Sequence, residues 1–222
     1  MGAPHRHNVA RYDLASVAYE PIGLALSLGQ MRRVQRAVAH ALRVGPDALV
    51  VELGCGPGNV TALLRERVGP QGSFVGVDFS PRMIERAEHR RVTEGWQNVR
   101  FECRDLLTYR PPLPADAVVF CLSLSTVPDC EAALRQALSI TRPGGQLVIA
   151  DSIPLHSRWY HALTNAYVRL KALMVGADGR SCILELARRE LADVRVSPMA
   201  FGVYTLIVGR RPDPDETART RS

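Results

Sequence analysis

Acidic side chains and closely spaced glycines stand where short apolar runs end in the first half of the chain. Glu52 is followed by a glycine loop (residues 54–58, GCGPG), and Asp78 and Asp105 follow the next two apolar runs. Glycines let the backbone turn sharply and let a ligand approach without meeting a Cβ atom. An acid about twenty residues beyond such a loop can accept hydrogen bonds from both hydroxyls of a ribose. These spacings predict a site for a nucleoside-containing cofactor.

The glycine spacing separates two cofactor classes. A dinucleotide fingerprint reads G-x-G-x-x-G and places the pyrophosphate at a helix N-terminus. Here the glycines read G-x-G-x-G, and Asn59 stands where the third fingerprint glycine would be. The carboxylate of Glu52 would oppose a pyrophosphate, whereas it would suit a cationic ligand. An NAD-dependent oxidoreductase is the alternative, and only the glycine loop and Asp78 favour it.

Buried strands and amphipathic helices alternate around these residues. Continuous apolar runs are typical of strands buried on both faces, and Ser80-Pro81 and Asp129 are typical of helix starts. The order predicts an α/β, Rossmann-like, doubly wound sheet whose strands carry their ligand site at the carboxyl ends. The expected strands span 48–53, 73–77, 99–103, 117–123 and 146–151, and the expected helices span 60–68, 81–91 and 131–140.

The segments before and after this region are predicted to add further helices and strands, in the following arrangement. Residues 1–45 form an N-terminal helical segment, with one or two helices over 22–42, that acts as a lid on the cofactor or substrate. Residues 46–210 form the main domain, with a helical insertion at about 155–191, and residues 211–222 form a flexible tail. Two last strands, 193–199 and 202–209, are joined by a tight turn. They complete a seven-stranded sheet, mostly parallel with an antiparallel C-terminal strand.

Length and composition exclude several classes of protein. A chain of 222 residues suits one domain, and 46% hydrophobic and 23% charged residues are typical of a globular protein. No apolar run reaches the roughly 18 residues of a membrane span. The first ten residues contain no apolar h-region, so no secretory signal is expected. We therefore expect a cytoplasmic location.

The positive charge and the cysteines limit which partners, metal sites and disulfides the chain is expected to have. The formal net charge is +6, and Lys171 is the only lysine. The arginines form no basic run and no patch with interleaved aromatic residues, which disfavours DNA and RNA as partners, whereas peripheral contact with acidic lipid headgroups is compatible with the charge. The five cysteines contain no C-x-x-C pair. We therefore expect no metal site and no disulfide framework, but buried thiols in a reducing compartment.

Four motifs in order, over roughly residues 44–152, resemble the class I S-adenosylmethionine-dependent methyltransferases. They are VVELGCGPG (50–58), VDFSPRMIERA (77–87), CRDLL (103–107) and TVPDCEAALRQALSITRPGGQLVIAD (126–151). Within that family, LSLSTVPD (122–129) and GVYTLIVGRR (202–211) are similar to segments of the small ubiquinone/menaquinone and phospholipid N-methyltransferase-type enzymes, which include the betaine-lipid enzymes.

The resemblance implies S-adenosylmethionine as cofactor and S-adenosylhomocysteine as product. It implies that the glycine loop cradles the methionine portion, that Glu52 supports the loop and the amino group, and that Asp78 binds the ribose hydroxyls. Three plainer interpretations stay open: Glu52 only caps loop amides, Met83 is ordinary helix core, and Asp105 is a solvated turn residue. The complete set of expected cofactor contacts is Tyr19, Glu52, Gly54, Cys55, Gly56, Gly58, Asp78, Phe79, Met83, Arg104, Asp105, Leu106, Cys121, Leu122 and Ser123.

The reaction that follows is in-line displacement at the sulfonium methyl by an N, O or C atom of a small amphipathic acceptor, such as a lipid, a quinone or a secondary metabolite. The family's N/D-P-P-[YFW] signature is absent after the fourth expected strand, which argues against DNA adenine or protein glutamine methylation. A cofactor-binding, RNA-associated protein without turnover is a further alternative. The acceptor atom and the oligomeric state stay open.

Candidate acceptor contacts and bases lie mostly outside the four motifs. We expect Tyr12, Ser125 and Trp159 to contact the acceptor. An amine acceptor needs no base once it is neutral, whereas a hydroxyl or carbon acceptor usually requires one. The candidate bases follow the fifth expected strand, and none of them is assigned as the catalytic base. They are Asp151, His156, Tyr160 and His161.

Overall fold

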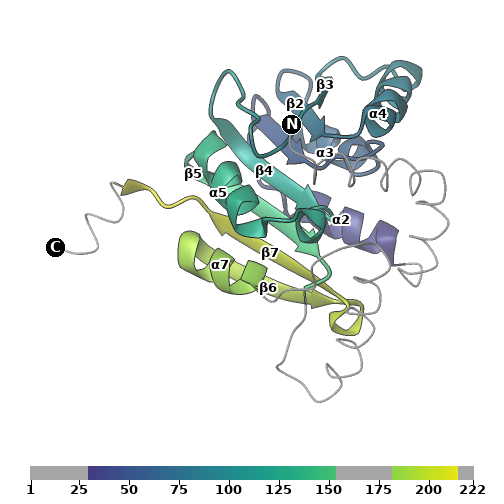
Figure 1. The fold of residues 1–222 in the computed structure, drawn as a ribbon. Coiled ribbons are helices and arrows are strands. Elements are labelled where there is room, and N and C mark those ends of the chain that lie inside the picture. Colours follow the sequence, from purple (N-terminus) through teal and green to yellow (C-terminus); the bar gives the residue numbers. More distant parts are fainter. Residues whose placement is uncertain (1–29, 154–181, 215–222) are drawn as a thin grey trace.

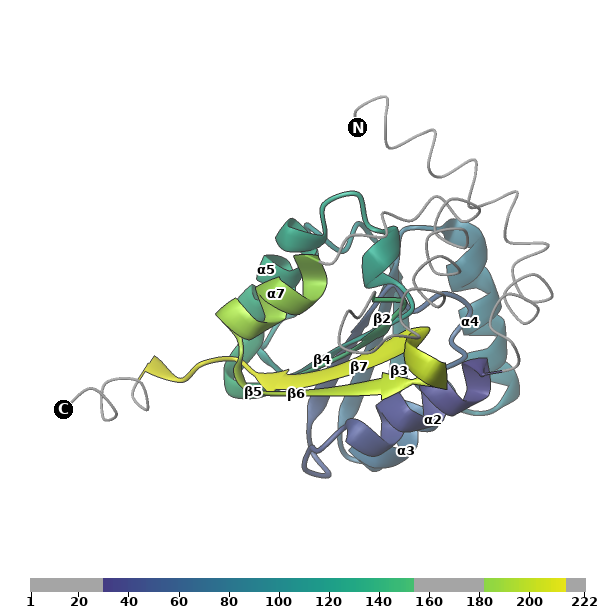
Figure 2. The ribbon, with the colours of Figure 1, turned by 90° about the horizontal axis from the view of Figure 1, so that it is seen from below.

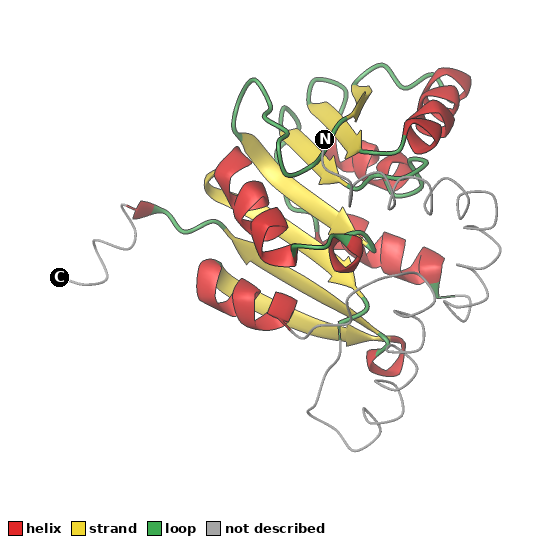
Figure 3. Ribbon diagram, viewed as in Figure 1, coloured by secondary structure: helices red, strands yellow, loops and turns green. Residues whose placement is uncertain are grey.

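A seven-stranded sheet runs through the part of the chain that the computed structural model describes, residues 30–153 and 182–214 (Figures 1 and 3). Its strand order is β3-β2-β1-β4-β5-β7-β6. The first five strands pair in parallel, and β7 is antiparallel to both of its neighbours, β5 and β6. The strands are β1 (Leu49–Leu53), β2 (Ser73–Asp78), β3 (Val99–Cys103), β4 (Ala115–Cys121), β5 (Thr141–Asp151), β6 (Ala192–Met199) and β7 (Tyr204–Arg210).

Helices cover both faces of this sheet (Figure 2). Helices α2 (Met31–Ala41), α3 (Thr61–Val68) and α4 (Pro81–Thr93) pack on one face, and α5 (Cys130–Ile140) and α7 (Cys182–Glu190) pack on the other. Because successive strand residues point to opposite faces, Val50 enters the core under α2 and α3 while Val51 enters the core under α5 and α7. Both side chains are fully buried. The doubly wound fold with an antiparallel C-terminal strand is confirmed.

Local signals begin the helices as expected. The hydroxyl of Ser80 accepts a hydrogen bond from the backbone N–H of Met83 at 3.4 Å, and Pro81 occupies the first position of α4. The Asp129 carboxylate accepts one from the N–H of Ala132 at 2.8 Å and so caps α5. Each cap satisfies an N–H that has no partner within its helix.

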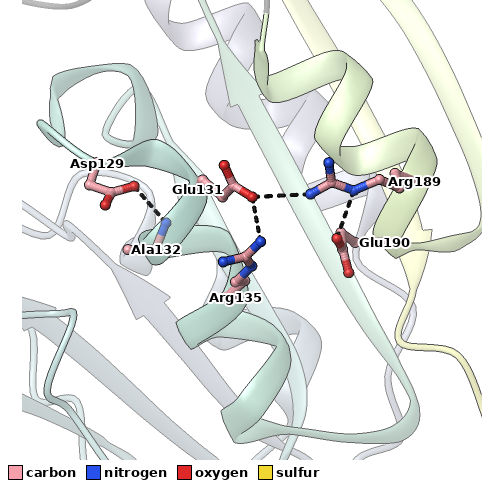
Figure 4. A network of polar contacts seen from close by, with 6 residues as sticks. All are labelled: Asp129, Glu131, Ala132, Arg135, Arg189 and Glu190. Atoms are coloured by element: carbon pink, nitrogen blue, oxygen red, sulfur yellow. Dashed lines mark hydrogen bonds and ion pairs between the residues drawn. The ribbon is translucent and has the colours of Figure 1, made fainter.

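An exposed ionic network joins α5 to α7 (Figure 4). The Glu131 carboxylate on α5 contacts Arg189 on α7 at 3.1 Å and Arg135 on its own helix at 2.5 Å. Exposed ion pairs contribute about 0–1 kcal/mol to stability. The apolar core that α5 and α7 share, which includes Ala133 and Ile183, therefore holds the two helices together more strongly than the network does.

Several strand boundaries differ from those expected; the last strand, for example, begins at Tyr204 rather than at residue 202. The fifth strand begins at Thr141 rather than at residue 146, because its Pro-Gly-Gly segment pairs with the chain beyond β7. The N–H of Gly144 donates to the carbonyl of Arg211 at 3.0 Å, and the N–H of Arg211 donates to the carbonyl of Gly145 at 2.8 Å. The fourth strand begins and ends two residues earlier than expected, and Leu122, just after it, adopts a φ of +59°.

Candidate functional site

The glycine loop connects the end of β1 to the start of α3 and is tied to the end of β2. The N–H groups of Gly54 and Cys55 both donate to the carbonyl of Val77, at 2.8 and 3.1 Å. Gly54, Gly56 and Gly58 have φ values of +73°, +52° and +76°, in the left-handed region that favours glycine. The loop therefore turns back across the carboxyl ends of β1 and β2, which together with the carboxyl end of β4 we term the carboxyl edge.

The three glycines differ in what surrounds them. A Cβ atom on Gly54 would lie 2.5 Å from the Cβ of Ser123, and one on Gly58 would lie 3.2 Å from the Cζ of Phe101. A Cβ atom on Gly56 would meet no heavy atom within 4 Å. Gly54 therefore allows the loop to approach β4 closely, whereas the space over Gly56 is open to a ligand.

Asp78 links the loop to the start of α4. Its side chain is only 8% exposed, and its two oxygens accept hydrogen bonds from the N–H groups of Gly56 and Ser80, each at 2.9 Å. Burial raises the pKa of Asp78 even though these hydrogen bonds lower it. Each carboxylate oxygen has a second lone pair that can accept a further hydrogen bond. The group is therefore held rigidly and can still receive hydroxyl donors.

Glu52 lies at the end of β1, only 1% exposed. The hydroxyl of Thr61, at the start of α3, donates to its Oε2 at 2.7 Å. Burial raises the pKa of Glu52 to about 8; the hydrogen bond from Thr61 lowers it, and the charge of Asp78 raises it further. The carboxyl is therefore protonated at neutral pH. Sequence reasoning missed Thr61, although a threonine that opens the helix after the loop was a visible signal.

Two thiols lie beside these acids. Burial raises the pKa of Cys55 and of Cys121 well above the usual value, and the charge of Glu52 raises both further. Both are therefore neutral thiols. Glu52 and Asp78 form no ion pair with any residue of the described ranges. A pair of buried acids without a counter-ion is complementary to a positively charged ligand.

The third acid, Asp105, stabilises the turn that follows β3, and this turn lies next to Asp78. Its Oδ1 accepts a hydrogen bond from the N–H of Leu107 at 2.9 Å, and the side chain is half-buried. The N–H of Arg104 donates to the carbonyl of Asp78 at 2.9 Å, while its exposed guanidinium pairs with Glu102 at 3.1 Å. The segment that follows β3 thus lies against the end of β2, with Leu106 buried beneath it.

The end of β4 closes the other side of the loop. The hydroxyl of Ser123 donates to the carbonyl of Leu53 at 2.8 Å, and the N–H of Leu122 donates to the carbonyl of Ala150 at 2.7 Å. A non-glycine residue with a positive φ, such as Leu122, costs conformational energy and is found more often at functional sites. Cys121, Leu122 and Ser123 therefore join β1, β4 and β5 beside the glycine loop.

Ser125 and Asp151 bind each other. Asp151 is 1% exposed and accepts hydrogen bonds from the N–H of Ser125 at 2.9 Å, from the hydroxyl of Ser125 at 2.6 Å and from the N–H of Ser152 at 2.7 Å. Asp151 therefore fixes the segment after β4 against the end of β5.

Two more of the expected cofactor contacts lie at the start of α4, Phe79 just before its N-cap and Met83 in its first turn. Phe79 is half-buried and Met83 is 5% exposed. The expectation of buried thiols is wrong for Cys103, which is exposed because it ends the edge strand β3 and donates only to the carbonyl of Phe79, at 3.6 Å. The other expected contacts and bases lie outside the described residues. They are Tyr12, Tyr19, His156, Trp159, Tyr160 and His161.

The carboxyl edge fits a cationic nucleoside cofactor such as S-adenosylmethionine. It offers open space over Gly56, a fixed carboxylate at Asp78 and a buried acid without a counter-ion at Glu52. Within residues 30–153 and 182–214, no three His, Cys, Asp or Glu side chains are grouped to hold a metal ion. Among the helices of those same ranges, none is long and apolar enough to cross a membrane.

Comparisons with known proteins also indicate an S-adenosylmethionine-dependent methyltransferase. A family model described as a methyltransferase domain matches residues 46–192. The demethylmenaquinone methyltransferase of Mycobacterium marinum is 27% identical over an alignment of 231 positions, gaps included. The alignment covers 94% of this chain and 95% of that protein. The trans-aconitate 2-methyltransferase of an Azoarcus species is 40% identical over 117 residues, 53% of this chain and 44% of that protein. The structure of human N-acetylserotonin methyltransferase in complex with S-adenosylmethionine superposes with a TM-score of 0.61 at 20% identity, covering 80% of this chain and 51% of that one.

Proposed function

Because this chain belongs to the methyltransferase domain family and is an S-adenosylmethionine-dependent enzyme, we propose that it methylates a small amphipathic acceptor of the demethylmenaquinone type. The methyl group passes in line to an electron-rich carbon or oxygen atom of the reduced ring. The interpretation of the glycine loop as a site for NAD is set aside, because the family match includes that loop and all three acids of the carboxyl edge.

The observation that carries this proposal is the extent of the similarity. The match to the trans-aconitate enzyme covers 53% of this chain, whereas the match to the demethylmenaquinone enzyme covers 94% of it. The longer match therefore includes the flanks, where we expect the acceptor-binding residues. In the sequence, large apolar residues recur at a spacing typical of one helix face, at Trp159, Leu163, Tyr167, Leu170 and Met174. This series and the net charge of +6 suit a lipophilic acceptor held at an acidic membrane surface.

In this proposal the residues of the carboxyl edge bind and orient the cofactor. Asp78 accepts hydrogen bonds from the ribose hydroxyls, and Glu52 supports the loop and the amino group, while Phe79 and Met83 flank the adenine. Cys121 and Ser123 form the floor beside the sulfonium. S-adenosylmethionine supplies an activated methyl group when bound. The protein then needs mainly to align the donor with the acceptor and to exclude water.

A ring carbon or hydroxyl acceptor must also lose a proton as the new bond forms. The carboxylate of Asp151 already accepts hydrogen bonds from the N–H groups of Ser125 and Ser152 and from the Ser125 hydroxyl. The proton therefore passes to a base on the segment after β5. His156, Tyr160 and His161 are the candidates, and a histidine serves best because its pKa lies near neutrality.

Methyl transfer from labelled S-adenosylmethionine to a panel of acceptors tests the proposal. The panel contains a reduced short-chain demethylmenaquinone, phosphatidylethanolamine, trans-aconitate and transfer RNA. We expect label in the organic-soluble quinone product. A His156→Ala or His161→Ala variant that removes the base should lower kcat by about a hundredfold or more without changing the affinity for S-adenosylhomocysteine.

Each other outcome of the panel has a definite meaning. Label that appears only in trans-aconitate, in phosphatidylethanolamine or in transfer RNA would overturn the quinone assignment and leave the methyltransferase itself intact. At S-adenosylmethionine concentrations below saturation, Asp78→Asn should lower transfer to every acceptor about a hundredfold. Asp116→Asn, which removes the same charge at the opposite end of the sheet, should leave it unchanged.

A further inference from the structure

A cavity of about 360 Å³ lies at the opposite end of the sheet from the glycine loop, where β4 and β5 begin and β7 ends (Figure 1). We term this end of the sheet the amino edge. The cavity belongs to no part of the site described above, since none of the acids of the carboxyl edge lines it. Its lining is Arg43, Val44, Gly45, Asp116, Arg142, Gly144, Gln146 and Arg210.

Three arginines and one acid line this cavity. Arg142 donates through Nε to Asp116 at 2.7 Å, and Arg210 donates through Nε at 2.7 Å to Asp193, which does not line the cavity. Arg43 is exposed, and its side chain makes no hydrogen bond or ion pair with any residue that the structure describes. The cavity therefore has an excess of positive charge.

Hydrogen bonds fix the wall that carries Arg43. The N–H of Arg43 donates to Oε1 of Gln146 at 2.7 Å, and Nε2 of Gln146 donates to the carbonyl of Ala41 at 3.0 Å. On the other wall, Oδ2 of Asp116 accepts a hydrogen bond from the N–H of Leu49 at 2.8 Å. The amide of Gln146 and the carboxylate of Asp116 are thus both engaged with the fold. The guanidinium of Arg43 is the cationic group that is left to bind a ligand.

We propose that this cavity binds the phosphate group of a soluble small molecule, with Arg43 as the principal contact and Arg142 and Arg210 as flanking cations. A guanidinium presents five N–H donors in a planar fork that matches two phosphate oxygens at once. Arg142 and Arg210 keep their places through Asp116 and Asp193, so little side-chain entropy is lost when the anion binds. The limited volume of about 360 Å³ favours a compact dianion over an extended polyanion.

Inorganic phosphate is the probe. Its affinity is measured by calorimetry at about pH 8, where the dianion dominates, with sodium chloride adjusted to hold the ionic strength constant. We expect Arg43→Gln to weaken phosphate binding about fivefold or more and Asp116→Asn to strengthen it about threefold. Arg36→Gln is the matched control, because Arg36 is an exposed arginine on α2 that does not line the cavity. It should change the affinity less than twofold.

The opposite signs at Arg43 and Asp116 separate a binding site from a general salt effect, since phosphate stabilises many proteins by exclusion from their surface. Equal phosphate responses in wild type, Arg43→Gln and Arg36→Gln would overturn the proposal. Vesicles of phosphatidylcholine with phosphatidic acid test the other source of a phosphate group. Arg43-dependent capture by these vesicles without binding of inorganic phosphate would overturn the soluble ligand. All variants should keep their affinity for S-adenosylhomocysteine, so this result is independent of the methyl acceptor.

Discussion

The two ends of the central sheet carry ionisable groups of opposite type, acids at one end and arginines at the other, in opposite surroundings. At the carboxyl edge, Glu52 and Asp78 are 1% and 8% exposed, and only neutral donors contact them. At the amino edge, the Arg142 and Arg210 side chains are 52% and 40% exposed and are paired with acids. A buried charge without a counter-ion is costly, whereas an exposed one is solvated and screened.

The difference indicates how strongly each end should bind its ligand. A cation that reaches the carboxyl edge favours the ionised forms of two buried acids, so its charge contributes strongly to the binding free energy. An anion at the amino edge replaces water around exposed guanidinium groups and gains much less. We therefore expect tight, specific binding at the carboxyl edge and weak, salt-sensitive binding at the amino edge.

Asp78→Asn should have the largest effect. The amide keeps one acceptor for the neighbouring N–H groups but loses the charge that strengthens hydrogen bonds from hydroxyl donors. We expect the affinity for S-adenosylhomocysteine, measured by calorimetry, to fall about a hundredfold. Asp116→Asn is the control at the amino edge, because Asp116 also accepts a backbone N–H, that of Leu49. An equal fall in the affinity of Asp78→Asn and Asp116→Asn for S-adenosylhomocysteine would contradict the difference between the two edges.

Two glycine substitutions should separate stability from binding. In Gly54→Ala the new Cβ would lie 2.5 Å from the Cβ of Ser123, so we expect unfolding in urea to become easier by about 2 kcal/mol or more. In Gly56→Ala the Cβ meets no protein atom within 4 Å. The free energy of unfolding should fall by only about 1 kcal/mol, while the affinity for S-adenosylhomocysteine falls about tenfold or more. Equal losses of stability and unchanged affinity would contradict an open ligand space over Gly56.

Glu52 should make cofactor binding depend on pH. Its pKa of about 8 means that the carboxyl is protonated below that pH and that a cationic ligand favours its ionisation. Between about pH 6.5 and pH 8.5 the affinity of wild type should therefore rise about tenfold relative to that of Glu52→Gln. The amino group of the cofactor titrates in both proteins and cancels in this ratio. A ratio that does not change with pH would contradict a protonated Glu52.

The same group should affect stability without ligand, with the opposite sign. Because the folded state binds the Glu52 proton more tightly than the unfolded chain does, folding stability falls as pH rises from about 4.5 to about 8. Urea unfolding of wild type and of Glu52→Gln measures this difference directly. The variant should show a smaller loss across that window, and an identical slope would count against the burial of this acid.

Ser125→Ala should have the smallest effect of these substitutions. It removes the 2.6 Å hydrogen bond from the Ser125 hydroxyl to Asp151 and keeps the hydrogen bonds that Asp151 accepts from the N–H groups of Ser125 and Ser152. We expect a loss of about 1–2 kcal/mol in the free energy of unfolding and no change in affinity for S-adenosylhomocysteine. A large change in that affinity would indicate that Ser125 contacts the cofactor, and would contradict a purely structural role for its hydrogen bond to Asp151.

The carboxyl edge was the more predictable of the two regions. Continuous apolar runs define the buried strands, and an acid or glycine at the end of each run defines where its ligand-facing residues stand, so Glu52, Asp78 and Asp105 could be found from the sequence. Contacts between distant segments could not. The hydrogen bond from Ser123 to the carbonyl of Leu53 joins residues 70 positions apart, and only the pairing of β1 with β4 brings them together.

The amino edge gave no such signal. Arg43, Arg142 and Arg210 come from three distant segments and look like scattered surface charges in the sequence. The pairing of β5 with β7 and the hydrogen bonds of Gln146 to the chain around Arg43 place them around one cavity. The Pro-Gly-Gly segment before residue 146 misled for the same reason, because its turn-like composition does not reveal that Arg211 pairs with Gly144 and Gly145. Local composition cannot report a partner that tertiary structure supplies.

A crystal structure of the full chain with S-adenosylhomocysteine tests the central claim most directly. We predict that both ribose hydroxyls lie within hydrogen-bonding distance of the Asp78 carboxylate and that the ligand's amino acid portion occupies the space over Gly56, close to Glu52. A ligand that lies away from these groups, or one that leaves Asp78 with only its bonds to Gly56 and Ser80, would contradict the assignment of the carboxyl edge as the cofactor site.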